Sequence, residues 1–520
     1  MSASFDVIVI GGGTNGLVAA TVLARRGRRV LLLERGPQVG GEARPMEFAP
    51  GFRAAPCSLD PGWLPAAVAS ALGITLPDFE AGTVSTGVAL GGGEFLTLDS
   101  APAAAAGAIR RFDARDAERW PAFAARLRKL AGFMEALYVL PPPDIDTTSP
   151  GEVFPLLGLG RKFRALGRED MIELLRVLPM AVQDLADDWF TSAPLRAAIA
   201  AAGVQDIRQG PRSAGTSFVL LHHLTGAAPG AVRRSGWWRE GPDALVRVLE
   251  GAATAAGVTV RTGTAVAGIA VRDDAVCGVV LASGEEIGAT AVLSTLDPVR
   301  TLRLVDPVWI GPEALHAFGN IKFRGARATV CYGLESDPGI PGSEAVVSMT
   351  GNPVALERAF DAAKYGAVSE RPHVTVTVPS RRWPGLAPAG QHVLVAHVQC
   401  APYALRNGTW GAATSGALAD AATRMIDEAA PGFAARVKHR VTLSPADLEA
   451  RYGLTEGSVA HGELTLDQVL FMRPVPGYGR YRMPVAGLYL GGAGAHPGPG
   501  ILGGPAWLAA RALLADGKGK

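Results

Sequence analysis

The chain has 520 residues, 48% of them hydrophobic, and its 50 Lys and Arg residues nearly balance 48 Asp and Glu residues. This length exceeds the size of a single hydrophobic core, so we expect two closely linked domains. A net charge of only +2 argues against a nucleic-acid-binding protein. No apolar run reaches the roughly 18 residues of a membrane-spanning helix. No signal-peptide pattern precedes the first expected strand, so the sequence predicts a cytoplasmic protein.

The four cysteines, Cys57, Cys277, Cys331 and Cys400, lie far apart in the sequence. Because there is no Cys-x-x-Cys pair, disulfide reductase chemistry and zinc-finger spacings are both excluded, and we expect no metal. We interpret these residues as reduced core cysteines of an intracellular protein.

The most informative segment spans residues 5–44. An apolar run over residues 7–10 leads into a Gly-Gly-Gly-Thr-Asn-Gly turn at 11–16, and a helical stretch follows. A second apolar run over 30–33 ends at Glu34. Strand, glycine-rich turn, helix, strand and acid in this order predict the βαβ unit that binds dinucleotides.

Each residue of this unit has its own expected role. Gly11 permits the tight turn, Gly13 lets the backbone approach a pyrophosphate, and Gly16 lets the helix pack closely on the strand. The helix N-terminus offers free N–H groups to the phosphates, and Glu34 can accept hydrogen bonds from the ribose hydroxyls. The expected dinucleotide contacts are Gly11, Gly13, Thr14, Asn15, Gly16 and Glu34.

The same unit serves NAD, NADP and FAD, and the residues that follow it favour FAD. Arg35 and a second glycine pair, Gly40-Gly41, come after the acid, which suits a ligand that continues beyond its ADP half. An NADP site would more often carry a basic residue in place of Glu34. The expected contacts with the rest of the cofactor are Arg35, Gly41, Glu42 and Ala43.

A second glycine-rich turn lies near the C-terminus. Residues 488–490 form a short apolar run, a Gly- and Pro-rich stretch follows, and a helical pattern begins at about Gly504. A helix that starts after such a turn can stabilise negative charge on a reduced flavin, and the alternative is an ordinary loop before a closing helix. The expected flavin contacts are Gly494, Gly500, Ile501 and Leu502.

Several further motifs occur together in one known family. They are SFVLLHH at 217–223, GWWREG at 236–241, STLDP at 294–298, HGE at 461–463, RP at 473–474 and GLYLGGAGAHPGPG at 487–500. With the N-terminal unit, they resemble the FAD-dependent phytoene desaturase (carotenoid desaturase) family of the flavin amine oxidase superfamily, and more narrowly its phytoene-dehydrogenase-related branch. The motifs occur in the expected order over nearly the whole chain.

This resemblance implies a flavin fold, non-covalent FAD, and redox chemistry on a hydrophobic or amine-like substrate. It also implies that Val266 holds the adenine through its backbone. Two departures concern the flavin edge of the pocket. Gly241-Pro242 stands where the family usually has Gly-Gly, and Pro499 and Pro505 interrupt the usual glycine-rich C-terminal loop.

We expect an α/β fold with a Rossmann-type FAD-binding domain, consisting of a central parallel sheet plus a β-meander, and an inserted α+β substrate domain. A short strand at 258–261, two alternating runs at 265–271 and 277–281, and a strand at 291–294 predict the meander. The FAD-binding domain is expected over residues 1–75, 230–300 and 455–520, and the substrate-binding domain over 76–229 and 301–454.

The two insertions differ in pattern. Residues 76–229 are rich in a helical Ala/Leu/Arg pattern, whereas residues 301–454 alternate like strands at 328–334, 373–378 and 392–398 before a helix at 414–430. Together they would form the floor and cover of an apolar pocket over the flavin. The glycines at 91–93 lack a following helix and acid, so we expect no second dinucleotide site.

Hydride transfer to a flavin needs little help from side chains, so candidate catalytic residues are few. His496 lies in the C-terminal loop, where it faces the flavin or stabilises the loop. His461 reaches the flavin face or stabilises a turn, with the turn favoured. Of the pair at 222–223, at most one residue faces the pocket, and for His222 packing is favoured over catalysis. Glu240 binds substrate or a neighbouring backbone group.

Residues 156–182 combine basic residues with Leu and Phe, which is the pattern of an amphipathic helix on a lipid surface. An ordinary exposed helix is the favoured interpretation, and peripheral membrane contact is the alternative. The sequence leaves the oligomeric state open between monomer and homodimer.

Two classes of enzyme fit these observations. The first is an FAD oxidoreductase that desaturates or oxidises a hydrophobic or aromatic small molecule by hydride transfer to flavin N5 and is reoxidised by oxygen or a quinone. The second is a redox-neutral isomerase or lyase. A non-catalytic flavoprotein partner is a third interpretation.

Overall fold

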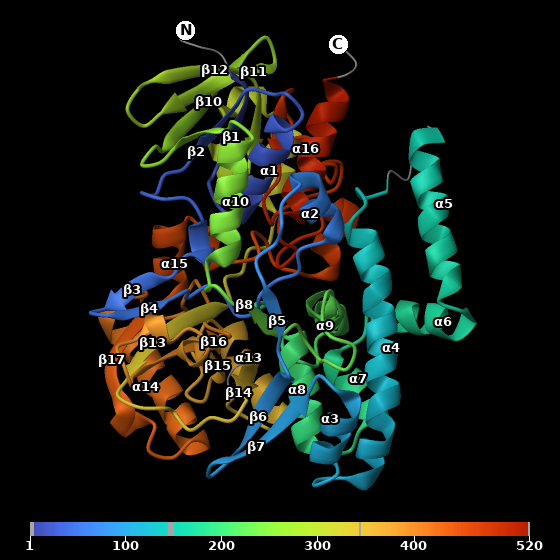
Figure 1. Cartoon of the computed structure of the whole chain (residues 1–520), viewed down its shortest axis with the longest axis vertical. Coiled ribbons are helices and arrows are strands. Elements are labelled where there is room, and N and C mark those ends of the chain that lie inside the picture. Colours follow the sequence, from blue (N-terminus) through green and yellow to red (C-terminus); the bar gives the residue numbers. More distant parts are fainter. Residues whose placement is uncertain (1–4, 144–149, 343–344, 518–520) are drawn as a thin grey trace.

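The computed structural model describes residues 5–143, 150–342 and 345–517. Two seven-stranded sheets organise these residues, one near the two termini and one at the opposite end of the molecule (Figure 1). Helices cover both sheets, and the expected α/β class is confirmed.

The first sheet has the strand order β10-β11-β12-β1-β2-β9, with β18 beside β12. Strands β9, β2, β1, β12 and β18 run parallel, whereas β10, β11 and β12 are antiparallel neighbours. This is the expected parallel sheet with its meander. The strands are β1 (Phe5–Ile10), β2 (Val30–Leu33), β9 (Thr259–Arg261), β10 (Val266–Arg272), β11 (Ala275–Leu281), β12 (Glu286–Ser294) and β18 (Leu488–Leu490).

The apolar runs of this sheet are buried on both faces, which is why they form continuous hydrophobic strings in the sequence. Helices α1 (Thr14–Ala24), α2 (Ala66–Leu72), α10 (Ala244–Ala255) and α16 (Gly504–Asp516) belong to the same end of the molecule. Helix α1 packs against both α10 and α16. Its approach to β1 is so close that a Cβ on Gly16 would overlap the carbonyl oxygen of Gly11. Gly11 itself has φ +97°, a conformation that favours glycine.

The second sheet has the order β17-β13-β16-β15-β14-β6-β7 and is antiparallel except where β14 meets β6. Its strands are β6 (Val84–Gly91), β7 (Glu94–Asp99), β13 (Arg327–Leu334), β14 (Val346–Ser348), β15 (His373–Thr377), β16 (His392–Gln399) and β17 (Val437–Leu443). Helix α14 (Ala412–Ala429) packs on one face, where Leu418, Ala422 and Ile426 meet alternate residues of the strands. The other face is turned toward the cavity described below.

Part of this sheet differs from the expectation. The helical pattern of residues 76–229 gave no sign of β6 and β7, which form a hairpin turned by Gly91, Gly92 and Gly93, all with positive φ. That turn explains the glycine run that lacked a dinucleotide motif. Strands β14 and β17 were also missed, since their partners lie far away in the sequence.

Two short two-stranded pairings and the remaining helices complete the described residues. One is the hairpin of β3 (Met46–Ala49) and β4 (Phe52–Ala54), and the other is a two-stranded antiparallel sheet in which β5 (Phe79–Ala81) pairs with the distant β8 (Gly236–Trp238). The helices are α3 (Pro102–Ile109), α4 (Ala114–Tyr138), α5 (Pro150–Ala165), α6 (Arg168–Val177), α7 (Val182–Trp189), α8 (Ala193–Gly203), α9 (Thr216–Leu224), α11 (Pro298–Arg303), α12 (Pro312–Gly319), α13 (Pro353–Lys364) and α15 (Pro445–Tyr452).

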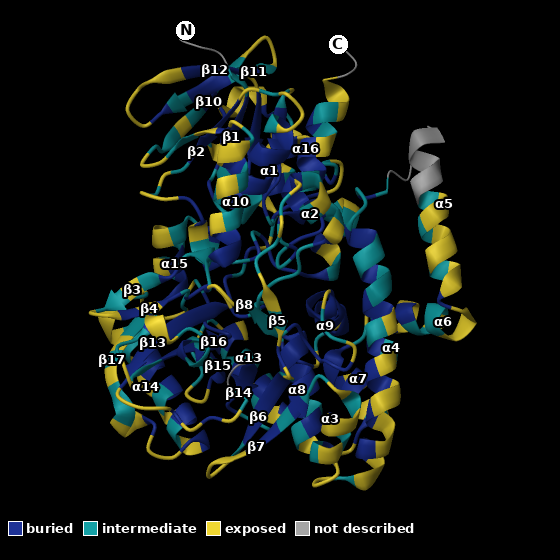
Figure 2. Cartoon of the chain, in the orientation of Figure 1, coloured by how far each residue is buried: buried dark blue, intermediate teal, exposed yellow. Residues whose placement is uncertain are grey.

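Helices α5 and α6 project from the body beside α4 (Figure 1), and much of their described surface is exposed (Figure 2). Among the described residues, no helix combines the length and the apolarity needed to cross a membrane.

The contact between α1 and β1 yields a prediction. Replacing Gly16 by Ala forces α1 away from Gly11 and should lower the free energy of unfolding by about 3 kcal/mol. The matched variant Gly13→Ala should lower the free energy of unfolding by about 1 kcal/mol or less. Its methyl group would meet open space, and the φ of Gly13, −71°, is one that alanine readily adopts. Denaturant unfolding of the cofactor-free proteins measures both values, and equal stability of the two variants would contradict the prediction.

Candidate functional site

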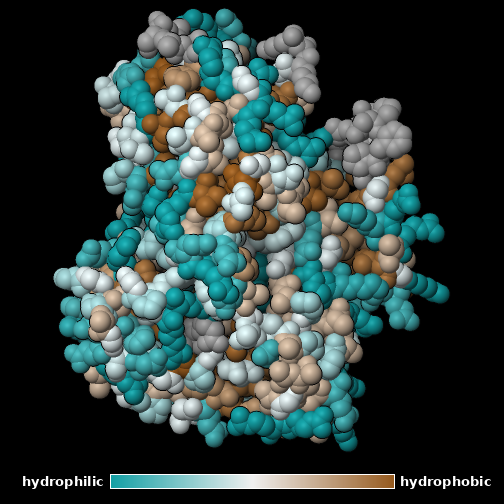
Figure 3. Space-filling view, viewed as in Figure 1, coloured by the Kyte–Doolittle hydropathy of each residue, from teal (hydrophilic) through white to brown (hydrophobic). Residues whose placement is uncertain are grey.

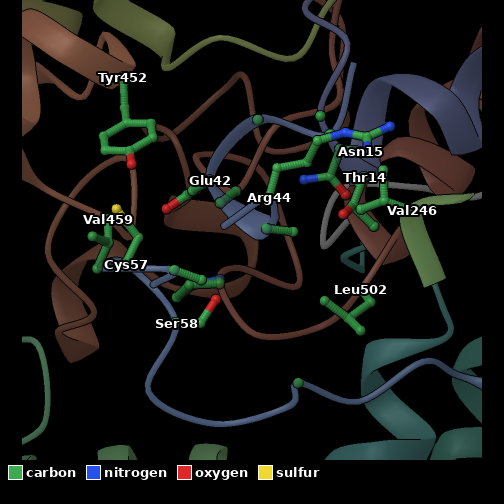
Figure 4. Close-up of a pocket in the computed structure, with 18 of the residues that line it drawn as sticks. Thr14, Asn15, Glu42, Arg44, Cys57, Ser58, Val246, Tyr452, Val459 and Leu502 are labelled. Carbon is green, nitrogen blue, oxygen red and sulfur yellow. The ribbon is translucent and has the colours of Figure 1, made fainter. Parts of the chain in front are cut away.

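A single cavity of about 1440 Å³ runs from the carboxyl ends of β1 and β2 to the second sheet. Gly11, Glu34 and Val266 line one end, and Val346 and Thr377 line the other. In Figure 4, the side chains near the α1 turn lie on one side of the cavity, and those of the segment around residue 57 lie on the other. The dinucleotide motif and the second sheet therefore border one continuous space.

The turn before α1 is open to this cavity. Gly13 caps the helix without any side-chain hydrogen bond, no acidic residue occupies the first turn, and a Cβ on Gly13 would meet nothing within 4 Å. The Oδ1 atom of Asn15 is buried and has no hydrogen-bond partner among the described residues. Free N–H groups at a helix N-terminus facing an open space suit a pyrophosphate.

Glu34 is held by backbone amides on both sides. Its Oε2 accepts a hydrogen bond from the Gly12 N–H at 2.7 Å, and its Oε1 accepts one from the Gly36 N–H at 2.6 Å. Each carboxylate oxygen has a further lone pair, so both can still accept a ribose hydroxyl.

The second glycine pair is shaped by the residues around it. Gly40 has φ +117°, and its N–H donates to the Gly12 carbonyl at 2.7 Å, which joins the two glycine turns. Arg44 donates to the Val39 carbonyl and pairs with Glu250 of α10 at 2.8 Å. These contacts hold the segment over the cavity wall.

The C-terminal loop closes the cavity from the other side. The Gly500 carbonyl accepts from the Trp63 N–H at 2.8 Å, and the Leu502 N–H donates to the Trp63 carbonyl at 2.8 Å. Gly500 has positive φ, and a Cβ there would lie 2.6 Å from the Arg234 guanidinium. The loop thus requires glycine at this position.

The structure places most of the expected cofactor residues at this cavity. The lining includes Gly11, Gly13, Thr14, Asn15, Glu34, Arg35, Gly41, Glu42, Ala43, Val266, Gly500, Ile501 and Leu502. Gly16 and Gly494 are not among the lining residues. Gly16 packs against Gly11, and a Cβ on Gly494 would lie 2.5 Å from the Pro298 ring.

Of the four candidate catalytic residues, His461 lines the cavity. Its Nδ1 is buried without a hydrogen-bond partner among the described residues. Burial lowers the pKa of this imidazole, and Asp297 only partly opposes the effect. His461 is therefore neutral at physiological pH and available as a hydrogen-bonding or proton-accepting group.

The other three candidates do not line the cavity. His222 is fully buried, with Nδ1 at 2.7 Å from the Tyr138 hydroxyl and Nε2 at 2.7 Å from the Pro499 carbonyl, so it anchors the C-terminal loop. His496 is hydrogen bonded to the backbone at the end of α4, and burial lowers its pKa to about 4. Glu240 is exposed and accepts from the Asp78 N–H at 3.1 Å, the backbone alternative that the sequence left open.

A buried ionic network at the cavity was missed. Arg234 pairs with Asp60 at 3.3 Å, and its Nη1 donates to the Thr225 carbonyl at 3.1 Å. His223 lies 3.4 Å from Arg234 and lines the cavity, whereas its neighbour His222 does not. Burial alone would raise the pKa of Asp60, but Arg234 and then His223 outweigh it and hold that pKa far below its usual range. The sequence feature that could have indicated this network is the pair of arginines at 233–234 within an apolar segment.

Cys57 also lines the cavity, next to Glu42. Burial raises the pKa of the Glu42 carboxyl, and burial together with Glu42 raises the pKa of the Cys57 thiol well above its usual value. All four cysteines, each among the described residues, are free. Cys57 therefore remains a thiol and has no thiolate reactivity.

One part of the cavity is lined by aromatic side chains. Trp237 and Trp238 of β8 and Trp383 line it, and the Trp383 indole N–H donates to the Trp238 carbonyl at 3.0 Å. The Arg382 guanidinium stacks 3.7 Å from the centre of the Trp237 ring. Trp383 comes from the second insertion, so no local pattern linked it to the other two.

This arrangement fits FAD. The open α1 turn suits the pyrophosphate, Glu34 suits the ribose, and the cavity continues past the ADP end between the second glycine pair and the C-terminal loop. Among the described residues, the same cavity also extends beyond that loop to the tryptophans, which leaves room for a substrate.

Comparisons with known proteins agree with this geometry. Residues 9–63 match the NAD(P)-binding Rossmann-like domain. A solved oxidoreductase from Methanosarcina mazei aligns with 98% of this chain and 100% of its own at a TM-score of 0.59 and 16% identity. Cyclohexylamine oxidase from Brevibacterium oxydans aligns with 99% and 100% at a TM-score of 0.56 and 15% identity. The fold is thus that of flavin amine oxidases.

Two similar sequences span nearly the whole chain. A limonene dehydrogenase component of Castellaniella defragrans is 24% identical over 98% of this chain and 94% of its own length. Pyridine nucleotide-disulfide oxidoreductase domain-containing protein 2 of Rattus norvegicus is 31% identical over 99% of this chain and 94% of its own. With the fold and the cavity, this similarity shows that the chain is an FAD-type oxidoreductase and belongs to the family of pyridine nucleotide-disulfide oxidoreductase domain-containing protein 2.

Proposed function

We propose that this protein oxidises or desaturates a hydrophobic or aromatic small molecule by hydride transfer to N5 of FAD. The observation that carries the proposal is the single cavity that leads from the dinucleotide motif to the pocket of Trp237, Trp238 and Trp383. Bound FAD supplies the hydride acceptor. The protein's own residues orient the substrate and exclude water, since the tryptophan pocket offers a large apolar contact surface.

The relatives support an apolar substrate. The limonene dehydrogenase component is named for a hydrocarbon, and cyclohexylamine oxidase is named for an amine with a cyclic apolar body. The resemblance to the phytoene-dehydrogenase-related branch adds an apolar polyene as a further substrate class. Oxygen or a quinone is the proposed electron acceptor.

Within the cavity we assign two roles. Glu34 and the α1 N-terminus hold the ADP half of the cofactor, and His461 is the candidate proton acceptor when the substrate is an alcohol or an amine. A redox-neutral isomerase or lyase would use the same residues, with His461 moving a proton between two carbon positions. A non-catalytic flavoprotein partner would need only the first role.

The first test concerns FAD. Gly13→Ala places a methyl group in the open space beside the α1 N-terminus, so FAD affinity should fall by about tenfold or more. Gly251→Ala on the exposed face of α10 is the matched control, because its methyl group also meets open space but lies away from the cavity. Titration of cofactor-free protein with FAD, followed by flavin fluorescence, measures both affinities. Unchanged affinity in Gly13→Ala would contradict the assignment.

The second test separates oxidation from isomerisation. We expect anaerobic addition of limonene, benzyl alcohol or cyclohexylamine to bleach the visible absorption of the bound flavin in proportion to product, and oxygen or a quinone to restore it. Conversion of a probe without net bleaching would favour the isomerase or lyase. Neither bleaching nor conversion with any of the three would favour the non-catalytic partner.

We also propose that α5 and α6 contact a membrane surface. Leu157, Ile172 and Leu175 are 58%, 57% and 63% exposed, and Arg161 and Arg164 lie exposed beside them. Figure 3 shows apolar and hydrophilic side chains side by side on this projection. Exposed apolar and cationic side chains together suit an anionic lipid surface.

Flotation with vesicles tests this contact. The full-length protein should bind vesicles that contain phosphatidylglycerol, and the double variant Leu157→Glu, Leu175→Glu should lose most of that binding. Val308→Glu is the matched control, since Val308 is 74% exposed on a different part of the surface. Equal binding by the double variant and the control, or no binding by the wild-type protein, would refute the contact.

A further inference from the structure

The inner face of the second sheet carries two adjoining rows of polar side chains. The register places Gln399 of β16 beside both Arg327 of β13 and His373 of β15. In the next row, His397 lies between Thr329 and Thr375. All six side chains are buried. Because the intervening residues pack under α14, these rows point toward the cavity side of the sheet.

Many polar atoms of this cluster have no hydrogen-bond partner among the described residues. The unpartnered atoms are Nε and Nη2 of Arg233, Nε of Arg327, Nε2 of Gln399, Nε2 of His373, Nε2 of His397, Oγ1 of Thr375 and Oε1 of Gln205. Buried polar groups are normally paired, and an isolated exception is already unusual. A group of unpaired atoms in one place, at least half of them N–H donors, indicates a site that a ligand completes.

The charges of the cluster are also unbalanced. Arg234 pairs with Asp60 and Arg327 pairs with Asp206 at 2.7 Å, so both nearby carboxylates already have a partner. Arg233 is 1% exposed and forms no ion pair among the described residues. A buried cation without a counter-ion is costly to keep.

The two histidines do not change this balance. Burial lowers the pKa of His373 to about 3 and the pKa of His397 well below its usual value. Both are therefore neutral at physiological pH and offer hydrogen bonds without charge. Burial raises the pKa of the Glu42 carboxyl, and the charge that acts on this carboxyl most strongly is that of Arg327 rather than Arg233. The cluster keeps the uncompensated positive charge of Arg233.

This cluster adjoins the substrate end of the cavity. Gln205 and Asp206 line the cavity, and Asp206 pairs with Arg327 and interacts with the charge of Arg233. Thr377 of β15 and Val395 of β16 pair with each other in the row next to Thr375 and His397, and both line the cavity as well. Arg233 and the polar rows are not lining residues themselves, so they adjoin the wall of this end of the cavity, which we call the substrate chamber.

We propose that this chamber binds a small molecule with an apolar or aromatic body and a carboxylate, and that Arg233 is the charge partner of that carboxylate. The inference rests on the proposed function and narrows its substrate class. The planar guanidinium offers Nε and Nη2 side by side, which matches the two oxygens of a carboxylate. Gln399 and His373 provide further hydrogen bonds, and the tryptophans contact the apolar body.

The test compares two probes of equal shape, 3-phenylpropanoate and the neutral 3-phenylpropan-1-ol. Calorimetric titration of the FAD-loaded protein should show affinity for the carboxylate at least about tenfold higher than for the alcohol. Arg233→Met should remove this preference, and Arg233→Lys should keep part of it. Arg272→Met is the matched control, because Arg272 is exposed at the end of β10, and its preference should equal that of the wild-type protein.

Equal affinity for the two probes in the wild-type protein, or no binding of the carboxylate, overturns the proposal. A preference that persists in Arg233→Met also overturns it. If Arg233→Met does not fold, the wild-type comparison and Arg233→Lys decide. Calorimetry measures binding without flavin reduction, so it tests the carboxylate site separately from the proposed oxidation. If the protein prefers the carboxylate but no probe bleaches the flavin under anaerobic conditions, the proposed oxidation is refuted and the proposed carboxylate site is not.

Discussion

The buried Arg234 guanidinium joins three distant segments of the chain at the centre of the cavity. It pairs with Asp60 from the N-terminal segment, donates to the Thr225 carbonyl after α9, and lies against Gly500 of the C-terminal loop. His222 adds a second link by binding the Pro499 carbonyl. Losing one partner of such a buried ion pair typically costs about 3–5 kcal/mol. The shape of the cavity between α1 and the C-terminal loop depends on this network.

The parts of the fold that the sequence predicts are those with local causes. The tight turn at Gly11, the helix contact at Gly16 and the acid after β2 lie within 24 residues of one another, so one segment contains the whole pattern. The meander is likewise made of strands adjacent in sequence. Strands β6 and β7 are also adjacent in sequence, and they were missed because the helical pattern of the surrounding insertion hid a local hairpin. The place of this hairpin in the sheet depends on β14, more than 250 residues later.

The catalytic residues illustrate the same limit. The sequence predicts that at most one of the two adjacent histidines faces the pocket. Which of them does depends on Tyr138 and Pro499, which satisfy both nitrogens of His222. His496 lies in a loop that does line the cavity, yet its ring turns to the end of α4. Such orientations depend on long-range packing, which a single sequence does not display.

The substrate chamber combines two kinds of surface because a strand alternates its side chains. One face of β13, β15 and β16 packs under α14 and must be apolar, which leaves the opposite face free to vary. On that face Val395 and Thr377 line the cavity, and the adjoining rows hold His397, Gln399 and Arg327. If the proposed carboxylate site is real, it narrows the apolar substrate class proposed above to amphipathic molecules, since a plain hydrocarbon would leave the polar rows unpaired.

The state of the cysteines constrains the electron path. Disulfide oxidoreductases pass electrons from flavin to a nearby cysteine pair, which requires a reactive thiolate. Here all four cysteines are free. Burial raises the pKa of Cys57 well above its usual value, and the pKa values of Cys331 and Cys400 to about 12. Since none of these three thiols ionises at physiological pH and Cys277 alone cannot form a pair, the described cysteines provide no disulfide that could accept electrons from the flavin. This agrees with the proposed external acceptor, oxygen or a quinone, and the cavity between the C-terminal loop and the second sheet is the described space that both substrate and acceptor would use.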